Sequence, residues 1–371
     1  MTLNRRTFLN NVTALATMGT AGGAIASAGS ALAQSGGRMR RIATEEAFAI
    51  PEQTEAMREV VENFSGYDPD IYLWEKILAG PVNRPLHDIG EGRIAQMDET
   101  GVDMHVLSLT STGVQMFDAD TGTAIAELAN DRLAEAVRNH PTRFGGLASF
   151  APQDVTRAVK EIERARTDLK LHGFVVNSHT NGEYLSEEKY WPILEALDAL
   201  EAPLYIHPRS PGGKHAAAYR ADHLEHAIWG YTAETGLHGI KLIMAGIFDR
   251  FPNLKIILGH MGENIPFHLY RTDYMYRLTV EMMDRVKLEK RPSDYFRDNF
   301  VITTSGVNWH PALKFSVDVL GAENVMWAID YPYQETPEAV EFMDTAPVSE
   351  EQKHLLFHGN AERVFGIEPL I

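Results

Sequence analysis

Several ionisable residues stand at the ends of short apolar runs, where they could act together on a metal ion or a proton. Three runs begin apolar and finish on His207, His260 and Asp330, and a fourth carries Glu45 and Glu46. Imidazole and carboxylate groups are common ligands of divalent cations and common general acids and bases. A single histidine after a strand is more often a satisfied structural residue. Four such groups meeting at one rim would be costly to bury without a partner, and one divalent cation satisfies them together.

These groups can meet only if the runs that carry them are parallel strands of one sheet. Short apolar runs alternate with helical patterns along the chain after the N-terminal region, as in repeated β–α units. The predicted strands are residues 41–49, 104–110, 144–150, 173–178, 204–207, 255–259, 300–305 and 325–330. The predicted helices include residues 123–140, 155–167, 187–200, 224–248, 265–288 and 311–320. Eight strands separated by helices favour an α/β fold, a single (β/α)8 TIM barrel, whose catalytic groups lie at the C-terminal ends of the strands.

One long stretch, residues 51–101, interrupts this alternation between the first and second strands. It is rich in polar residues, proline and glycine, with short helical pieces, and we expect it to form a cap over the barrel mouth. The sequence contains no repeat, no low-complexity tract and no linker that would divide the rest. Residues 34–371 are therefore predicted to form one barrel domain that includes this cap insertion.

The composition excludes several classes of function. The formal net charge of −17 argues against nucleic acid or an anionic membrane surface as a partner, because such partners are bound by Lys and Arg. The chain contains no cysteine, which excludes disulfides, thiolate metal sites and cysteine nucleophiles. No glycine-rich dinucleotide loop follows a predicted strand, so a redox enzyme is disfavoured.

The first 33 residues have the pattern of a twin-arginine signal peptide. Arg5 and Arg6 are followed by Thr7 and Phe8, residues 11–33 carry no charge, and a small-x-small site ends at Ala33. The many Gly and Ser residues disfavour an uncleaved membrane anchor. A disordered tail does not explain why the paired arginines, the uncharged segment and the cleavage site follow one another in this order. We therefore expect export to the periplasm, with cleavage after Ala33.

At the strand ends the sequence resembles the decarboxylase branch of the amidohydrolase superfamily. That branch includes γ-resorcylate, 2,3-dihydroxybenzoate and aminocarboxymuconate-semialdehyde decarboxylases, and the resemblance is greatest to the 5-carboxyvanillate decarboxylases. The matching segments are Ala-Thr-Glu-Glu-Ala-Phe-Ala (43–49), Leu-Thr-Ser-Thr-Gly-Val-Gln (109–115), Asn-Ser-His-Thr (177–180), Tyr-Ile-His-Pro (205–208), Leu-Gly-His-Met-Gly-Glu (258–263) and Asp-Tyr-Pro-Tyr (330–333). The resemblance extends from residue 41 to about residue 365 and covers the whole predicted barrel.

The resemblance implies a site for one divalent metal ion, held by Glu45, His207 and Asp330. Most members of the superfamily have a metal-binding histidine two residues after the first ligand, on the same face of the strand, where this chain has Ala47. The 5-carboxyvanillate-type enzymes share this departure. Two carboxylates and one imidazole form a hard ligand set, which favours Mn²⁺ over Zn²⁺. Glu46 should point away from the barrel interior, and we assign it a structural role.

The resemblance also implies a reaction, the non-oxidative decarboxylation of an ortho-hydroxylated aromatic carboxylic acid similar to carboxyvanillate or a hydroxybenzoate. Asp330 is the expected proton donor to the ring carbon that bears the carboxylate. His260 is expected to polarise or deprotonate the phenol. Glu263, three residues further along, is expected to orient His260.

Four further residues are expected to contact the substrate, and the family is typically homodimeric. Arg271 matches a family position that binds the substrate carboxylate, and Arg84 in the cap insertion is a second candidate; either could instead form a surface ion pair. Thr110 and Asn177 lie in the shared motifs at the ends of the second and fourth strands. The expected partners are therefore a small aromatic acid and a second copy of the chain.

Two other functions remain open on the sequence alone. The same metal and the same Asp330 could activate water against an ester, lactone or amide, and export favours such a periplasmic hydrolase. A solute-binding protein that lost catalysis with the histidine at position 47 is a third possibility. Four intact ionisable groups, Glu45, His207, His260 and Asp330, argue against that third reading.

Overall fold

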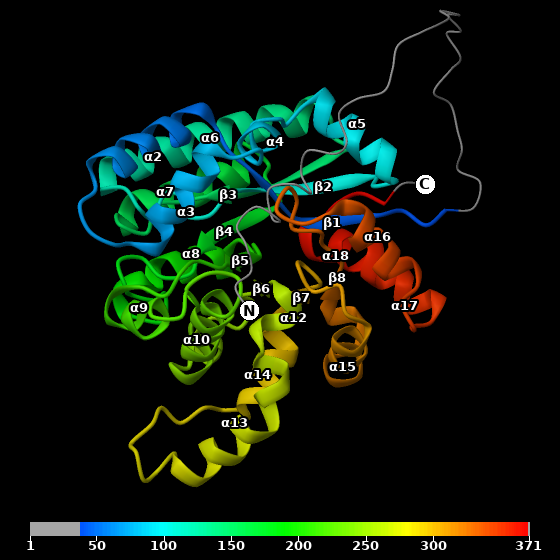
Figure 1. The fold of residues 1–371 in the computed structure, drawn as a ribbon. Coiled ribbons are helices and arrows are strands. Elements are labelled where there is room, and N and C mark those ends of the chain that lie inside the picture. The colour runs from blue at the N-terminus through cyan, green and yellow to red at the C-terminus, as the bar shows by residue number, and fades with distance from the viewer. Residues whose placement is uncertain (1–37, 370–371) are drawn as a thin grey trace, which may run out of the picture. The chain divides into compact units, whose positions relative to one another are not determined.

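Eight parallel strands follow one another around the sheet in chain order, and helices surround them (Figure 1). The computed structural model describes residues 38–369, so the predicted signal peptide lies outside the described residues. The strands are β1 (Ile42–Phe48), β2 (Met104–Leu109), β3 (Phe144–Ser149), β4 (Gly173–Asn177), β5 (Leu204–His207), β6 (Ile256–Leu258), β7 (Phe300–Thr303) and β8 (Val325–Met326). Backbone amides of Thr44 and Ala47 donate to the carbonyls of Trp327 and Tyr331, at 3.1 and 2.7 Å, which joins β1 to the chain after β8. The predicted (β/α)8 TIM barrel is confirmed.

Helices cover the outer face of the barrel because their apolar residues recur at helical spacing. In one of them, α7, the buried residues Ala158, Ile162 and Ala165 form one stripe, and the side chain of Asp154 caps its first turn. The helices are α2 (Pro51–Asn63), α3 (Pro69–Ala79), α4 (Asn83–Leu86), α5 (Glu91–Thr100), α6 (Ala119–Asn139), α7 (Val155–Thr167), α8 (Trp191–Ala199), α9 (Gly213–Arg220), α10 (Gly230–Met244), α11 (Ile247–Arg250), α12 (His260–Glu263), α13 (Ile265–Thr279), α14 (Pro292–Asn299), α15 (His310–Leu320), α16 (Thr336–Asp344), α17 (Glu350–His354) and α18 (Asn360–Phe365). Within residues 38–369, no helix combines the length and the apolar character needed to cross a membrane.

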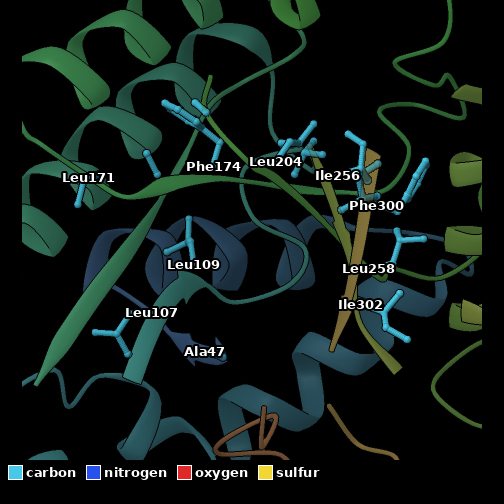
Figure 2. Packing of buried hydrophobic residues seen from close by; sticks show 14 of the residues in the cluster. Ala47, Leu107, Leu109, Leu171, Phe174, Leu204, Ile256, Leu258, Phe300 and Ile302 are labelled. Carbon is cyan, nitrogen blue, oxygen red and sulfur yellow. The ribbon is translucent and has the colours of Figure 1, made fainter. Parts of the chain in front are cut away.

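The core has two apolar layers, because successive side chains of a strand point to opposite faces. In β6, Ile257 belongs to the cluster inside the barrel, while Ile256 and Leu258 belong to the cluster between sheet and helices. Figure 2 shows part of the outer cluster, with Leu107 and Leu109 of β2 on one side of the view and residues of β6 and β7 on the other. The inner cluster fills the barrel away from the C-terminal ends of the strands, where polar side chains lie instead.

Residues 51–101, the predicted cap insertion, contain four short helices, α2 to α5. Asp70 of α3 accepts hydrogen bonds from the Nε and Nη2 atoms of Arg209 at 3.0 and 2.8 Å, and from the amide of Ser210 at 3.1 Å. All three residues are buried. Since Arg209 and Ser210 follow β5, the start of α3 lies on the C-terminal side of the barrel; that the insertion caps the mouth stays a prediction.

Some predicted bounds were wrong. The strand expected at 325–330 ends at Met326, because the amide of Ala328 bonds to the side chain of Thr304 and leaves the ladder. The helix expected at 224–248 is two helices, α10 and α11, separated at Gly246, whose φ of 71° is left-handed. The helix expected at 265–288 ends at Thr279.

Candidate metal centre and active site

An irregularity in β1 determines which of two adjacent glutamates points into the barrel. Ala43 pairs with His105 and Glu46 pairs with Leu107, so β1 has one residue more than β2 over this stretch. Ile42 points into the barrel, so strict alternation along the strand would point Glu46 inward as well. The extra residue after Ala43 reverses this alternation. Glu45 therefore points inward, as predicted, and Glu46 points outward.

Three side chains from different strand ends lie close enough to bind one cation. Glu45, His207 and Asp330 each offer a ligand atom, and these atoms lie within 4.8 Å of one another. The Oε1 atom of Glu45 is 3.5 Å from the Nε2 atom of His207. The structure thus brings together the three residues that the sequence predicts as ligands.

Glu45 is held by one carboxylate oxygen and leaves the other without a partner. Its Oε2 atom accepts hydrogen bonds from Tyr205 and, at 3.0 Å, from Thr303. Its Oε1 atom is buried and has no hydrogen-bond partner among the described residues. A β-carbon added at Gly259 would lie 2.7 Å from Oε2, so only glycine leaves room for Glu45 there. A buried carboxylate oxygen without a donor fits a cation ligand.

His207 presents an unprotonated nitrogen to the same space. Its Nδ1 atom lies 2.9 Å from the carbonyl oxygen of Pro208, which can only accept, so Nδ1 carries the proton. The lone pair of Nε2 then faces Glu45. Burial lowers the pKa of His207, which favours the neutral imidazole that binds metals.

The protein supplies too little positive charge for the two carboxylates. Burial raises the pKa of Glu45, although His260 and His207 oppose this shift. Burial likewise raises the pKa of Asp330, again opposed by His260. Desolvation penalises both anions, and a divalent cation would restore their ionised forms. The donor set therefore fits one divalent ion.

His260 and Glu263 form a pair at the tight turn that follows β6. The Nδ1 atom of His260 donates to the Oε1 atom of Glu263 at 2.7 Å, and Thr232 donates to the other oxygen of Glu263. Residues 260–264 all have positive φ, between 50° and 78°, which brings the two side chains together. Burial alone would lower the pKa of His260, but the charges of Glu263 and Glu45 outweigh it and raise this pKa well above its ordinary value. These charges favour the protonated imidazole of His260, which its hydrogen bond to the Glu263 carboxylate holds in place.

A cavity of about 650 Å³ opens beside these groups. His260, Glu263 and Asp330 line it together with aromatic side chains, among them Trp229 and Trp309. Both tryptophans are more than half exposed, so they form an apolar rim. A cavity with a polar floor and an aromatic rim fits a small aromatic ligand.

None of the four predicted substrate contacts lines this cavity. Thr110 is buried, with its hydroxyl 2.6 Å from that of Tyr333, and Asn177 is buried beside Gly113. Arg271 on α13 and Arg84 on α4 are exposed. Their contacts with a substrate remain predictions.

Sequence reasoning missed the residues that hold the predicted ones. Tyr205 stands two positions before His207, and Thr303 ends β7, so both point into the barrel beside Glu45. The alternation of a strand could have identified both of them. No pattern indicates Thr232, which is far from Glu263 in the sequence and touches it only in the fold.

Comparison with known proteins agrees with this geometry. A family model described as amidohydrolase matches residues 67–367. A γ-resorcylate decarboxylase from Polaromonas sp. is 33% identical over 333 residues, which cover 88% of this chain and 98% of the relative. The crystal structure of a 5-carboxyvanillate decarboxylase from Sphingomonas paucimobilis shares 48% identity and superposes with a TM-score of 0.87, covering 89% of this chain and 100% of the other. A second 5-carboxyvanillate decarboxylase, from Novosphingobium aromaticivorans and complexed with manganese and 4-hydroxy-3-methoxy-5-nitrobenzoic acid, shares 40% identity with a TM-score of 0.86 and covers 88% of this chain and 96% of the other. The chain therefore belongs to the amidohydrolase family.

Proposed function

We propose that this protein is a metal-dependent decarboxylase of an ortho-hydroxylated aromatic carboxylic acid. The observation that carries this proposal is the convergence of Glu45, His207 and Asp330 beside the pair of His260 and Glu263, at one end of the barrel. Relatives that match over most of the chain act on γ-resorcylate and 5-carboxyvanillate, and their similarity favours decarboxylation over hydrolysis of an ester, lactone or amide.

The resident cofactor is one divalent ion, Mn²⁺ rather than Zn²⁺, held by Glu45, His207 and Asp330. The two carboxylates and the single imidazole support this choice, since oxygen-rich sites suit Mn²⁺. Manganese is present in the crystal structures of the Novosphingobium relative and of a dihydroxybenzoic acid decarboxylase from Polaromonas. When bound, the ion would draw electron density from the phenol and carboxylate oxygens of the substrate.

The side chains that line the cavity supply the proton chemistry. Asp330, an ionised ligand when the metal is bound, takes up the proton that the phenol gives up and delivers it to the ring carbon that bears the carboxylate. The ring becomes a dienone as the phenolate electrons form the new C–H bond. The C–C bond to the carboxylate then breaks, its electrons restore the aromatic ring, and CO₂ leaves. His260, held through Nδ1 by Glu263, donates from Nε2 to the phenol oxygen and stabilises its charge.

A screen of aromatic acids with a metal control tests this function. Purified protein depleted of metal and reloaded with Mn²⁺ should release CO₂ from carboxyvanillate or from a hydroxybenzoate. The nitro analogue 4-hydroxy-3-methoxy-5-nitrobenzoic acid should inhibit competitively, because its planar nitro group imitates the scissile carboxylate. Hydrolysis of neutral lactones without any release of CO₂ would replace the decarboxylase with a hydrolase.

The protein acts as a homodimer through α13, and the expected carboxylate contact of Arg271 occurs across this interface. Two observations support this pairing. Phe267 and Tyr270 of α13 are 76% and 83% exposed, and the helix extends away from the barrel (Figure 1). Phe267 also lines the mouth of the cavity one turn from Arg271, so the exposed face adjoins the site.

Mixed dimers test the contact across the interface. Chains with Arg271→Ala and chains with Asp330→Asn should each be inactive, and their co-refolded mixture should recover activity. Recovery follows because one site of the mixed dimer then has both an intact Asp330 and the arginine of the other copy. If Arg271 acts within its own chain, both sites of the mixed dimer lack one group, and no activity returns.

The protein is exported by the twin-arginine route. The paired Arg5 and Arg6, the uncharged segment that follows and the cleavage site after Ala33 support this proposal. Replacing both arginines with lysine should keep the unprocessed protein in the cytoplasm, as cell fractionation would detect. Normal arrival of that variant in the periplasm would contradict the proposal.

A further inference from the structure

The backbone of Asp330 has an unusual conformation and lies outside the regular sheet. β8 ends at Met326, and Asp330 has a φ of 77°, in the left-handed region that L-residues other than glycine rarely adopt. The amides on either side of it donate to one side chain: Ile329 to the Oε1 atom of Glu46 at 3.0 Å, and Tyr331 to its Oε2 atom at 2.9 Å. Such a conformation persists only when its surroundings hold it.

A buried arginine from α5 completes this arrangement. Arg93 donates to the carbonyl oxygen of Ala47 at 2.8 Å, and its guanidinium lies 4.8 Å from the ring centroid of Tyr331. Glu46 and Arg93 are both almost fully buried, at 0% and 1% exposed. Burial raises the pKa of Glu46, and the two backbone amides and the charge of Arg93 oppose this shift by favouring the carboxylate, which accepts on both oxygens.

We infer that Glu46 is a positioning residue for Asp330, and that it fixes the backbone on both sides so that the Asp330 carboxylate faces Glu45 and His207. Glu46 does point away from the cavity, as the sequence predicts, but it ends on the two residues that flank the proton donor. The inference rests on the proposed function for the role of Asp330 in proton transfer. Its effect on metal binding does not depend on which reaction follows.

Glu46 could instead only fasten the seam between β1 and β8, and Thr44 provides a matched control for that role. The Thr44 hydroxyl donates to the carbonyl oxygen of Trp327 at 2.8 Å, in the same seam and equally buried. Thr44→Val removes this hydrogen bond with little change of side-chain shape. The lost bond is to Trp327, three residues before Asp330. A residue that only closes the barrel should affect the protein as Thr44 does.

The experiment compares Glu46→Gln with Thr44→Val in the purified mature protein. Glutamine keeps one acceptor but turns an NH₂ group toward the second amide, so one of the two hydrogen bonds from Ile329 and Tyr331 is lost. We expect Glu46→Gln to lower both the Mn²⁺ affinity and kcat by about 10–100-fold, the usual effect of losing a partner that orients a ligand. Thr44→Val should lower the melting temperature about as much as Glu46→Gln does. It should leave Mn²⁺ affinity and kcat within about twofold of wild type.

Mn²⁺ affinity is read from the electron paramagnetic resonance signal of the free ion, so it is measured without turnover. Unchanged Mn²⁺ affinity and kcat in a folded Glu46→Gln protein would overturn the inference and leave Glu46 as a seam residue. If Glu46→Gln does not fold, Glu46→Asp decides, because its shorter carboxylate reaches only one amide: weaker Mn²⁺ binding than in Thr44→Val supports the inference, and equal binding overturns it. Wild type that binds Mn²⁺ but releases no CO₂ would reject the proposed function, while the affinity comparison would still judge the role of Glu46.

Discussion

The Nε2 atom of His260 lies 3.9 Å from the Oδ2 atom of Asp330, and both side chains line the same cavity from different strand ends. A cationic imidazole and a buried carboxyl group so placed can act on neighbouring atoms of one small ring. The first binds the oxygen that gains charge, and the second delivers a proton to carbon.

Removing a predicted ligand should remove the metal. His207→Ala and Asp330→Ala should each lose bound Mn²⁺ and nearly all activity, because two remaining ligands hold a divalent ion poorly. Metal content after dialysis, measured by inductively coupled plasma mass spectrometry, checks this. Glu263→Gln is the control, since Glu263 bonds to His260 and should leave the metal in place. Full metal content in both ligand variants would show that the site lies elsewhere.

His260 should matter for turnover and not for metal binding. His260→Asn is expected to lower kcat by about 10²–10⁴-fold, the usual range for a general acid–base group, with unchanged Mn²⁺ content. Glu263→Gln should have a smaller effect on kcat, because it orients His260 without touching the substrate. Steady-state kinetics at saturating Mn²⁺ measures both variants. Loss of metal with His260→Asn would instead make His260 a ligand.

Gly259 tests how tightly Glu45 is held. The β-carbon of Gly259→Ala would lie 2.7 Å from the Oε2 atom of Glu45 and 2.9 Å from the hydroxyl of Tyr205, so Glu45 must move. The backbone of Gly259, with φ near −70°, accepts alanine without strain, so only the contact matters. We expect Mn²⁺ affinity to fall by about 10–100-fold. Gly145→Ala in β3, whose nearest new contact is 3.4 Å, should bind Mn²⁺ like wild type. Equal affinity in the two variants would mean that Glu45 is mobile.

Buried neutral histidines should make the barrel sensitive to mild acid. Burial lowers the pKa of His172 to about 4 and that of His238 to about 3, from an ordinary value of 6.5. Between the lowered pKa of the folded state and the ordinary pKa of 6.5, the unfolded chain binds more protons than the folded one. The stabilising contribution is therefore present above about pH 6.5 and is lost as the pH falls toward 4. His172 alone should account for about 2–3 kcal/mol of this loss.

Melting temperatures measured from pH 7 to pH 4.5 check this dependence. His172→Asn keeps an acceptor for the amide of Gly146 and should flatten the curve, whereas His268→Asn at an exposed position should not. Curves of the same slope for wild type and His172→Asn would contradict the assignment.

The barrel and its ligand triad could be predicted because both follow from local patterns. Apolar runs that end on His207 and Asp330 indicate strands, and parallel strands bring their ends to one rim. The conformation of Asp330 could not be predicted, because it depends on Glu46, a side chain 284 positions away. The position of Arg271 was equally beyond reach, since helical periodicity does not say whether an exposed arginine faces its own cavity or the solvent.

The most direct test of the central claim is the fate of one ring carbon. The Mn²⁺-loaded protein, supplied with carboxyvanillate or a reactive hydroxybenzoate in D₂O, should release one CO₂ for each molecule of substrate consumed. The product should carry one deuterium on the carbon that held the carboxylate, as nuclear magnetic resonance and mass spectrometry would detect, and Asp330→Asn should abolish both signals. Aromatic acids recovered unchanged, together with hydrolysis of neutral esters or lactones by the same Mn²⁺-loaded protein, would contradict the account.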